Sequence, residues 1–152
     1  MGKSLGVWGL VATYLFLTGC QSNAPKPLYD RLGGEMMISA IVEDFVGEAA
    51  SDPRVNFTRK GTSAEWIPTP DNVDKLKLHL TQYLEAASGG SQEYEGGDMR
   101  SVHANMEITN AEFDAIEADL AKSLAKYDEP PKETSELLAI VEATRKDIVQ
   151  VK

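Results

Sequence analysis

Residues 94–104 read YEGGDMRSVHA, and this stretch carries the most specific pattern in the chain. The two glycines favour a turn, and Asp98 then stands where the N-cap of a helix is expected. Counted from Met99, His103 and Met106 lie at i+4 and i+7, so all three share one helix face. The stretch therefore predicts a short helix after Asp98 that carries a histidine on an apolar face.

The chain has one other histidine, His79, and its setting is similar. It shares a predicted helix face with Leu76, Leu80 and Tyr83, because the four residues lie at i, i+3, i+4 and i+7. A buried imidazole needs partners for its polar nitrogens, so neither histidine is placed on an apolar face without cost.

One histidine of this kind is more often a core residue bonded to a backbone carbonyl. Two of them on separate apolar helix faces favour a flat, apolar cofactor that takes one or two axial imidazoles. A zinc site fits less well, because the apolar neighbours offer no carboxylates. A hydrolytic site also fits less well, because no nucleophile stands at a recognisable turn. The residues alone thus predict a helical domain suited to hold haem.

The rest of the chain repeats apolar residues with a period near 3.6, without strand-like alternation. We expect one all-α domain with helices over 28–32, 35–50 and 72–87, and a helix opened by the capping box Thr109–Glu112. A last helix is expected to carry Leu137, Leu138, Val141, Arg145 and Ile148. Residues 51–72, rich in Ser, Thr, Gly and Pro, form an unusually long connection. Its aromatics, Phe57 and Trp66, are expected to pack on the body.

Composition narrows the classes of function. Hydrophobic residues make up 42% of the chain and charged residues 26%, which is typical of a globular domain. Asp+Glu outnumber Lys+Arg by 24 to 15, a net charge of −9, and this argues against nucleic acid as a partner. A single cysteine, Cys20, excludes an intramolecular disulfide and a thiolate metal site.

Residues 1–20, MGKSLGVWGLVATYLFLTGC, read as a secretory signal segment with a short apolar core. The ending Leu17-Thr18-Gly19-Cys20 resembles a bacterial lipobox, which implies cleavage before Cys20 and lipid attachment to its sulfur. The alternative is an ordinary signal peptide that ends in cysteine. Residues 21–27 read as a polar tether. With Gln21 after the cysteine, we expect a lipid-anchored protein of the cell envelope, on the periplasmic face of the outer membrane.

Several motifs, in this order, resemble the group I truncated haemoglobins. They are the opening LYDRLGG at 28–34, Gly89-Gly90, the stretch 94–104, Ile108-Thr109, Phe113-Asp114 and Asp119-Leu120. The resemblance implies a truncated globin domain over 28–152, a two-over-two helical sandwich that encloses one haem b, with one iron per chain. It also implies that His103 is the proximal iron ligand.

The same comparison finds differences on the distal side. The family's Phe-Tyr pair falls on Phe45-Val46, and its distal glutamine falls on Leu80, so two donors to bound oxygen are missing. His79 matches a position at which some family members carry a second iron ligand, and we hypothesise that it ligates the iron; the alternative is that it only lines the pocket. Residues 58–71 look like an insertion. The other expected haem contacts are Phe45, Phe57, Leu76, Leu80, Leu84, Tyr94, Met99 and Met106.

The resemblance implies a haem protein that binds diatomic ligands: oxygen, nitric oxide or carbon monoxide. A second hypothesis is an enzyme that converts nitric oxide to nitrate or uses peroxide, although no dedicated catalytic constellation is seen. A third is a bis-histidyl electron carrier with an unknown electron donor. The remaining alternative is a helical lipoprotein that binds no haem.

Overall fold

The structure is a computed structural model that describes Gly2 and residues 24–151. That part of the chain contains seven helices: α1 (Leu28–Arg31), α2 (Gly34–Ser51), α3 (Pro70–Ala87), α4 (Met99–Val102), α5 (Asn110–Lys126), α6 (Pro131–Glu142) and α7 (Arg145–Ile148). Its only β pairing is one isolated bridge between Thr109 and Val151. The predicted all-α fold is therefore confirmed. None of the described helices is long and apolar enough to cross a membrane.

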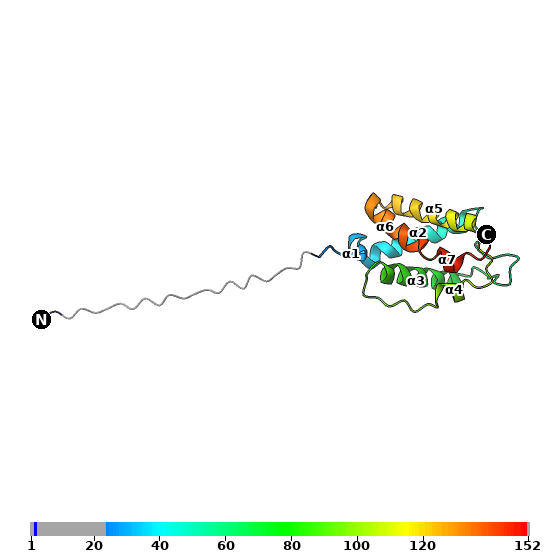
Figure 1. Cartoon of the computed structure of the whole chain (residues 1–152), viewed down its shortest axis with the longest axis horizontal. Coiled ribbons are helices and arrows are strands. Elements are labelled where there is room, and N and C mark those ends of the chain that lie inside the picture. The colour runs from blue at the N-terminus through cyan, green and yellow to red at the C-terminus, as the bar shows by residue number, and fades with distance from the viewer. Residues whose placement is uncertain (1, 3–23, 152) are drawn as a thin grey trace.

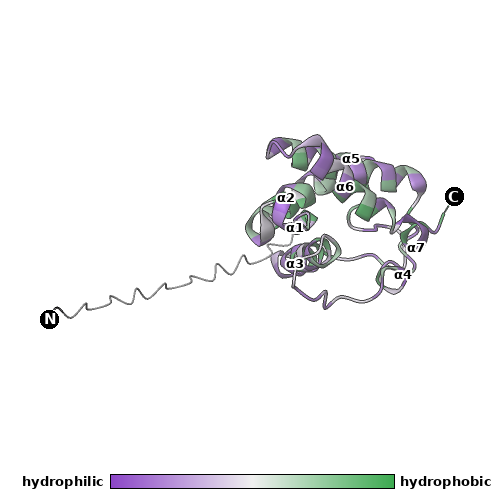
Figure 2. Cartoon of the chain, turned by 60° about the vertical axis from the view of Figure 1, so that its left-hand side comes forward, coloured by the Kyte–Doolittle hydropathy of each residue, from purple (hydrophilic) through white to green (hydrophobic). Residues whose placement is uncertain are grey.

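The long helices form two layers, α2 with α3 and α5 with α6, and one layer lies over the other (Figure 1). Helix α2 packs against both α3 and α5, and α5 packs against α6. The centre of the core is fully buried and aliphatic, with Ile41 and Val42 of α2, Leu124 of α5 and Leu137 of α6. Each such side chain contributes about 1.5–3 kcal/mol through its burial. In Figure 2, α3 lies on one side of the body and α4 and α7 lie on the other.

Local sequence explains where these helices begin. Gly33 and Gly34 have φ of +91° and +72°, a backbone conformation that glycine adopts without strain, and the chain turns there from α1 into α2. Helix α3 begins with Pro70 at its first position and is capped by Thr69, whose side chain accepts a hydrogen bond from Asn72 N at 3.3 Å. The capping box predicted at Thr109–Glu112 opens α5 and is confirmed.

The start of α1, with Pro27 before it, lies against the end of α3. The N–H of Tyr29 donates to the carbonyl of Ser88 at 2.9 Å. A Cβ added at Gly89, where φ is +93°, would lie 3.1 Å from Pro27 Cβ. On the other side of α1, Arg31 pairs with two glutamates of α6. Helix α1 thus joins the end of α3 to α6. The predicted signal segment, apart from Gly2, and Cys20 lie outside the described residues.

Two helices are shorter than the sequence predicts. Helix α4 ends at Val102, so the prediction that Met106 continues the same helix face as His103 is wrong. Asn105 and Glu107 adopt left-handed φ values of +63° and +54°, which an α-helix cannot contain.

The last predicted helix is also divided, into α6 and α7, at Ala143 and Thr144. The hydroxyl of Thr144 donates to the carbonyl of Val141 at 2.6 Å, and this side-chain bond competes with the helix ladder.

Candidate functional site

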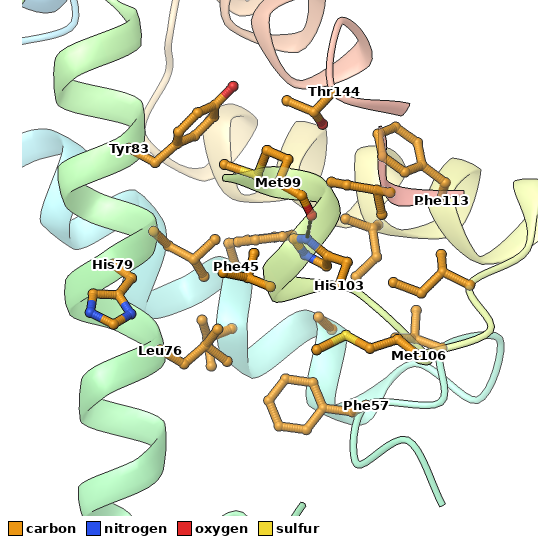
Figure 3. Close-up of a pocket in the computed structure, with 18 of the residues that line it drawn as sticks. Phe45, Phe57, Leu76, His79, Tyr83, Met99, His103, Met106, Phe113 and Thr144 are labelled. Carbon is orange, nitrogen blue, oxygen red and sulfur yellow. Dashed lines mark hydrogen bonds between the residues drawn. The ribbon is translucent and has the colours of Figure 1, made fainter. Parts of the chain in front are cut away.

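A cavity of about 610 Å³ lies between the two helical layers. Its wall is built from α2, α3, α4 and the connection 52–69, with residues of α5, α6 and α7 on the opposite side. Most of the lining side chains are apolar (Figure 3). Protein interiors are close-packed and leave few voids larger than a water molecule. A cavity of this size, lined in this way, is the candidate ligand site of the described residues.

The inner face of α3 explains how the cavity arises. The long apolar side chains Leu76, Leu80 and Tyr83 are only half-buried, although they point toward the body of the protein. In α2 the residues of the corresponding face, such as Val42 and Phe45, are buried. The face of α3 is therefore apolar but incompletely covered by protein, as expected where a flat apolar molecule takes the place of side chains.

All ten residues predicted to contact the cofactor line this one cavity: Phe45, Phe57, Leu76, His79, Leu80, Leu84, Tyr94, Met99, His103 and Met106. They come from α2, α3, the segment around α4 and the connection after α2. Their roles toward haem stay a prediction, but their convergence on one cavity is a structural fact.

His103 is placed as a metal ligand would be. Its Nδ1–H donates to the carbonyl of Met99 at 2.8 Å; a carbonyl can only accept, so the proton of the neutral ring sits on Nδ1. Nε2 is then unprotonated and carries a free lone pair. Burial lowers the pKa of His103, and the positive charge of Arg59 lowers it further against the opposing effect of the Met99 bond. Metal-ligating histidines are oriented by this kind of bond from the second nitrogen.

His79 differs from the prediction. It lines the cavity, but its side chain is exposed, so the prediction that it is buried on an apolar face is wrong. In Figure 3 its ring lies against α3 and does not point at His103. The physical reason is that the cavity opens at this face of α3, so that a residue on its margin meets solvent.

The α2 wall of the cavity is apolar. Phe45, Val46 and Ala49 are buried there, and Leu76 and Leu80 face them from α3. Val46 and Leu80 are the two positions at which the sequence resemblance expected a tyrosine and a glutamine. Neither side chain can donate a hydrogen bond to a molecule inside the cavity.

Tyr83 and Tyr94 add phenol groups at another part of the wall. Their rings pack edge-to-face with centroids 5.5 Å apart. Burial is the main cause that raises the pKa of each phenol, so both remain neutral at neutral pH. A Cβ at Gly96 would collide with the Tyr94 hydroxyl, so the Tyr-x-Gly spacing is required by packing.

Sequence reasoning missed a further group of lining residues, including Arg59, Ile116 and Val141. The apolar ones belong to helix faces that periodicity assigns to the protein core. Trp66 packs on Phe57 with ring centroids 5.4 Å apart, and its Nε1–H donates to the Phe57 carbonyl at 2.8 Å. Phe57 packs against the core, as predicted, and Trp66 packs on Phe57.

The cavity fits haem on its own evidence. It has the apolar walls that a porphyrin needs and one half-buried neutral histidine with Nε2 free. A two-over-two helical fold around such a cavity defines a truncated globin. The chain belongs to this family: residues 27–150 match the family model described as bacterial-like globin. Members of the family bind haem.

Relatives with known names support the same family. The chain is 31% identical to the group 1 truncated hemoglobin of Tetrahymena pyriformis over 127 residues, 84% of this chain and 98% of that protein. A group 1 truncated hemoglobin of Mycolicibacterium paratuberculosis is 29% identical, with 77% and 79% covered. The Fe(III) crystal structure of the Tetrahymena protein has a TM-score of 0.70 at 30% identity, over 82% of this chain and 98% of that one. The group II truncated hemoglobin of Bacillus anthracis shares the fold at 19% identity, with a TM-score of 0.70 and 85% and 95% covered.

Proposed function

We propose that the chain binds one haem b, with His103 as the proximal iron ligand, and that the haem takes up diatomic ligands: oxygen, nitric oxide or carbon monoxide. The observation that carries the proposal is the neutral imidazole of His103, held by Met99 with Nε2 free beside an apolar cavity. When bound, the haem supplies an iron atom with a coordination position for a small ligand. The protein would supply the proximal bond from His103 and an apolar wall around the haem.

The apolar α2 wall sets the ligand preference. Bound oxygen carries more negative charge than bound carbon monoxide and gains more from a hydrogen-bond donor. Because Val46 and Leu80 offer no donor, we propose weak oxygen binding compared with binding of carbon monoxide or nitric oxide.

The direct test is a titration of the purified chain with haemin, followed by absorption spectra of the ferric and the dithionite-reduced protein. The proposal expects saturation at one haem per chain and a ferrous spectrum that changes on addition of carbon monoxide. Absence of saturable haem uptake would contradict the proposal.

A bis-histidyl redox protein is the second candidate, and the observation in its favour is that the two histidines of the chain line one cavity. It requires the exposed His79 side chain to turn inward and an electron donor that is not identified. Nitric oxide dioxygenation or peroxide chemistry on the same haem would need an electron source as well.

The His79→Leu variant separates the two candidates. We expect it to keep its haem, with the affinity changed by less than about threefold, because an exposed side chain is lost while the proximal bond remains. Ferrous absorption spectra of wild type and variant give the measurement. Sharp, split bands in the wild type that collapse in the variant would support the second candidate; one broad band in both would support the first. A large loss of haem would contradict the exposed position of the side chain.

We also propose that the chain is a lipoprotein of the cell envelope, anchored through Cys20 on the periplasmic face of the outer membrane. The support is the sequence Leu17-Thr18-Gly19-Cys20 followed by Gln21. A Cys20→Ser variant should therefore fail to incorporate radiolabelled palmitate and should leave the membrane fraction. The Thr18→Ser variant keeps a small residue at its position and serves as the matched control, which should label normally. Equal labelling of wild type and Cys20→Ser would contradict lipidation at Cys20.

A further inference from the structure

Arg59 lies in the connection 52–69 between α2 and α3, and its environment is unusual for a loop arginine. It is 6% exposed, and its φ of +53° lies in the left-handed region. That backbone conformation is unfavourable for a residue with a long side chain, and burial of a guanidinium is unfavourable unless every donor finds a partner. Residue 59 thus combines two unfavourable features, a left-handed backbone and a buried guanidinium.

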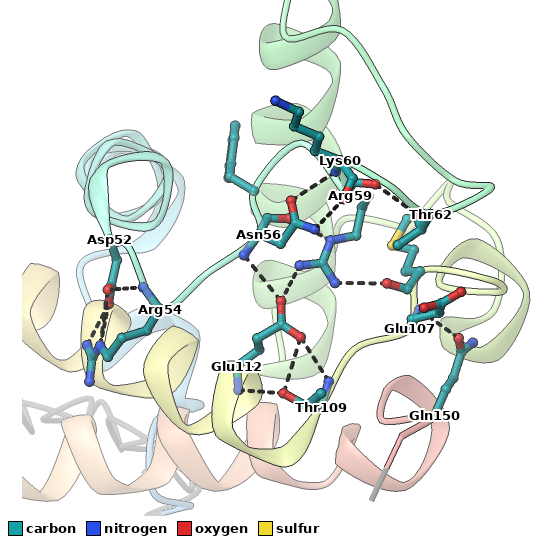
Figure 4. Close-up of polar contacts among 12 residues, drawn as sticks. Asp52, Arg54, Asn56, Arg59, Lys60, Thr62, Glu107, Thr109, Glu112 and Gln150 are labelled. Carbon is teal, nitrogen blue, oxygen red and sulfur yellow. Dashed lines mark hydrogen bonds and ion pairs between the residues drawn. The ribbon is translucent and has the colours of Figure 1, made fainter.

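The contacts of Arg59 offset these costs and fix the side chain (Figure 4). Its Nε–H donates to the carbonyl of Asn56 at 2.6 Å, and Nη1–H donates to the carbonyl of Met106 at 2.9 Å. Nη2 forms an ion pair with Glu112. Glu112 is also the capping-box acid of α5 and accepts from the backbone N–H groups of Asn56 and Thr109 at 3.2 and 3.0 Å. Arg59 therefore joins the connection, α5 and the segment after α4.

The contact of Arg59 with Met106 matters because Met106 lies three residues after His103. His103 is the C-cap residue that follows α4, so helix hydrogen bonds do not hold the chain on its C-terminal side. Two side chains from elsewhere hold it instead. Arg59 holds the Met106 carbonyl, and the N–H of Met106 donates back to the His103 carbonyl at 3.2 Å. From the C-terminal segment, Gln150 donates to the His103 carbonyl at 2.8 Å.

We propose that Arg59 is a positioning residue for His103: by holding the Met106 carbonyl it fixes the segment 103–107 and, through it, the direction of the imidazole. The connection 52–69 joins α2 to α3. Through Arg59 it also contacts the segment that follows His103, on the other side of the cavity. The part of this inference that concerns iron rests on the proposed function. The part that concerns the imidazole does not.

The test compares Arg59→Met with Arg54→Met. Arg54 lies on the same connection, but it is exposed and bonds Asp52, so it is a matched control for loss of a loop cation. In the chain without haem, nitrogen-15 NMR of the imidazoles reports the His103 tautomer. We expect one tautomer, protonated on Nδ1, in the wild type and Arg54→Met, and a mixture in Arg59→Met. In the haemin-loaded protein we expect about tenfold faster haem loss in Arg59→Met alone, and after reduction with dithionite a shifted iron–histidine Raman band in the same variant.

A double variant, Arg59→Met with Glu112→Gln, separates positioning from simple stabilisation. Glutamine keeps the capping box, and the double variant leaves no buried unpaired carboxylate. We expect it to regain most of the thermal stability lost in Arg59→Met but to keep the tautomer mixture and the fast haem loss. If stability falls in Arg59→Met while the tautomer, the haem loss rate and the Raman band stay as in wild type, the positioning role is overturned. If the wild type takes up no haem but the tautomer still responds to Arg59→Met, the proposed function fails and the positioning role stands.

Discussion

The His103→Ala variant is expected to lose stoichiometric haem binding, with the dissociation constant for haem raised by roughly 100-fold or more, about 2.7 kcal/mol. The cavity offers one half-buried neutral histidine whose Nε2 is free, and the bond to Met99 gives this nitrogen a fixed direction. The other histidine, His79, is exposed and cannot take over the proximal role from its place on α3. Only nonspecific apolar contact would hold haem in the variant.

The haem content of the purified variant and a haemin titration measure this effect. His103→Gly with added imidazole is the informative companion, because the free base can occupy the space left by the side chain. Uptake restored by imidazole would show that the lost group is the ligand and not the fold. Normal haem content in His103→Ala, without imidazole, would refute the assignment of the proximal ligand.

The Val46→Tyr variant, which introduces a hydroxyl at the α2 wall, is expected to raise the oxygen affinity strongly. Val46 is 4% exposed and lines the cavity, so in Val46→Tyr a phenol can reach a ligand within it. A hydrogen bond to a ligand that carries partial charge contributes about 1.5–3 kcal/mol, so we expect oxygen affinity to rise by about 10- to 100-fold. Carbon monoxide affinity should change much less, since that ligand is less polar.

Val46→Phe controls for this experiment, because it adds the same ring without the hydroxyl. The ratio of oxygen to carbon monoxide affinity, from dissociation and association rates, gives the measurement. An equal change of the ratio in both variants would assign the effect to ring volume. An unchanged ratio in Val46→Tyr would contradict an α2 wall that controls ligand preference through the absence of a donor.

The helices could be predicted from sequence because their signals are local. Apolar spacing indicated the inner faces of α2 and α5, and the pair Thr109 and Glu112 indicated the start of α5 to the residue. His103 was singled out because it stands among apolar helix positions, and the resemblance to the truncated haemoglobins then implied its proximal role. The end of α4 could not be predicted in this way: it depends on left-handed residues held by Arg59 and Gln150, which come from distant parts of the sequence.

The position of His79 and the burial of Arg59 show a second limit. Periodicity states which residues share a face, but it does not distinguish a face covered by protein from one that borders an open cavity, and His79 lies on the second kind. Arg59 stands among Ser, Thr and Gly residues, where an arginine normally extends into solvent. Its burial depends on Glu112 and on the Met106 carbonyl, which only the folded chain brings to it.

The contact of Pro27 with Gly89 has a practical consequence. Pro27 rests on Gly89 beside α1, whereas the connection 52–69 and α4 lie at the far end of the molecule (Figure 1). The 18 residues of α2 separate the two ends by about 27 Å at 1.5 Å per residue. A purification tag, a fluorophore or an electrode linker joined at the N-terminal side would leave the histidine end clear. Gln150, in the C-terminal segment, donates to the His103 carbonyl, so a handle attached close to Gln150 would disturb the backbone of His103.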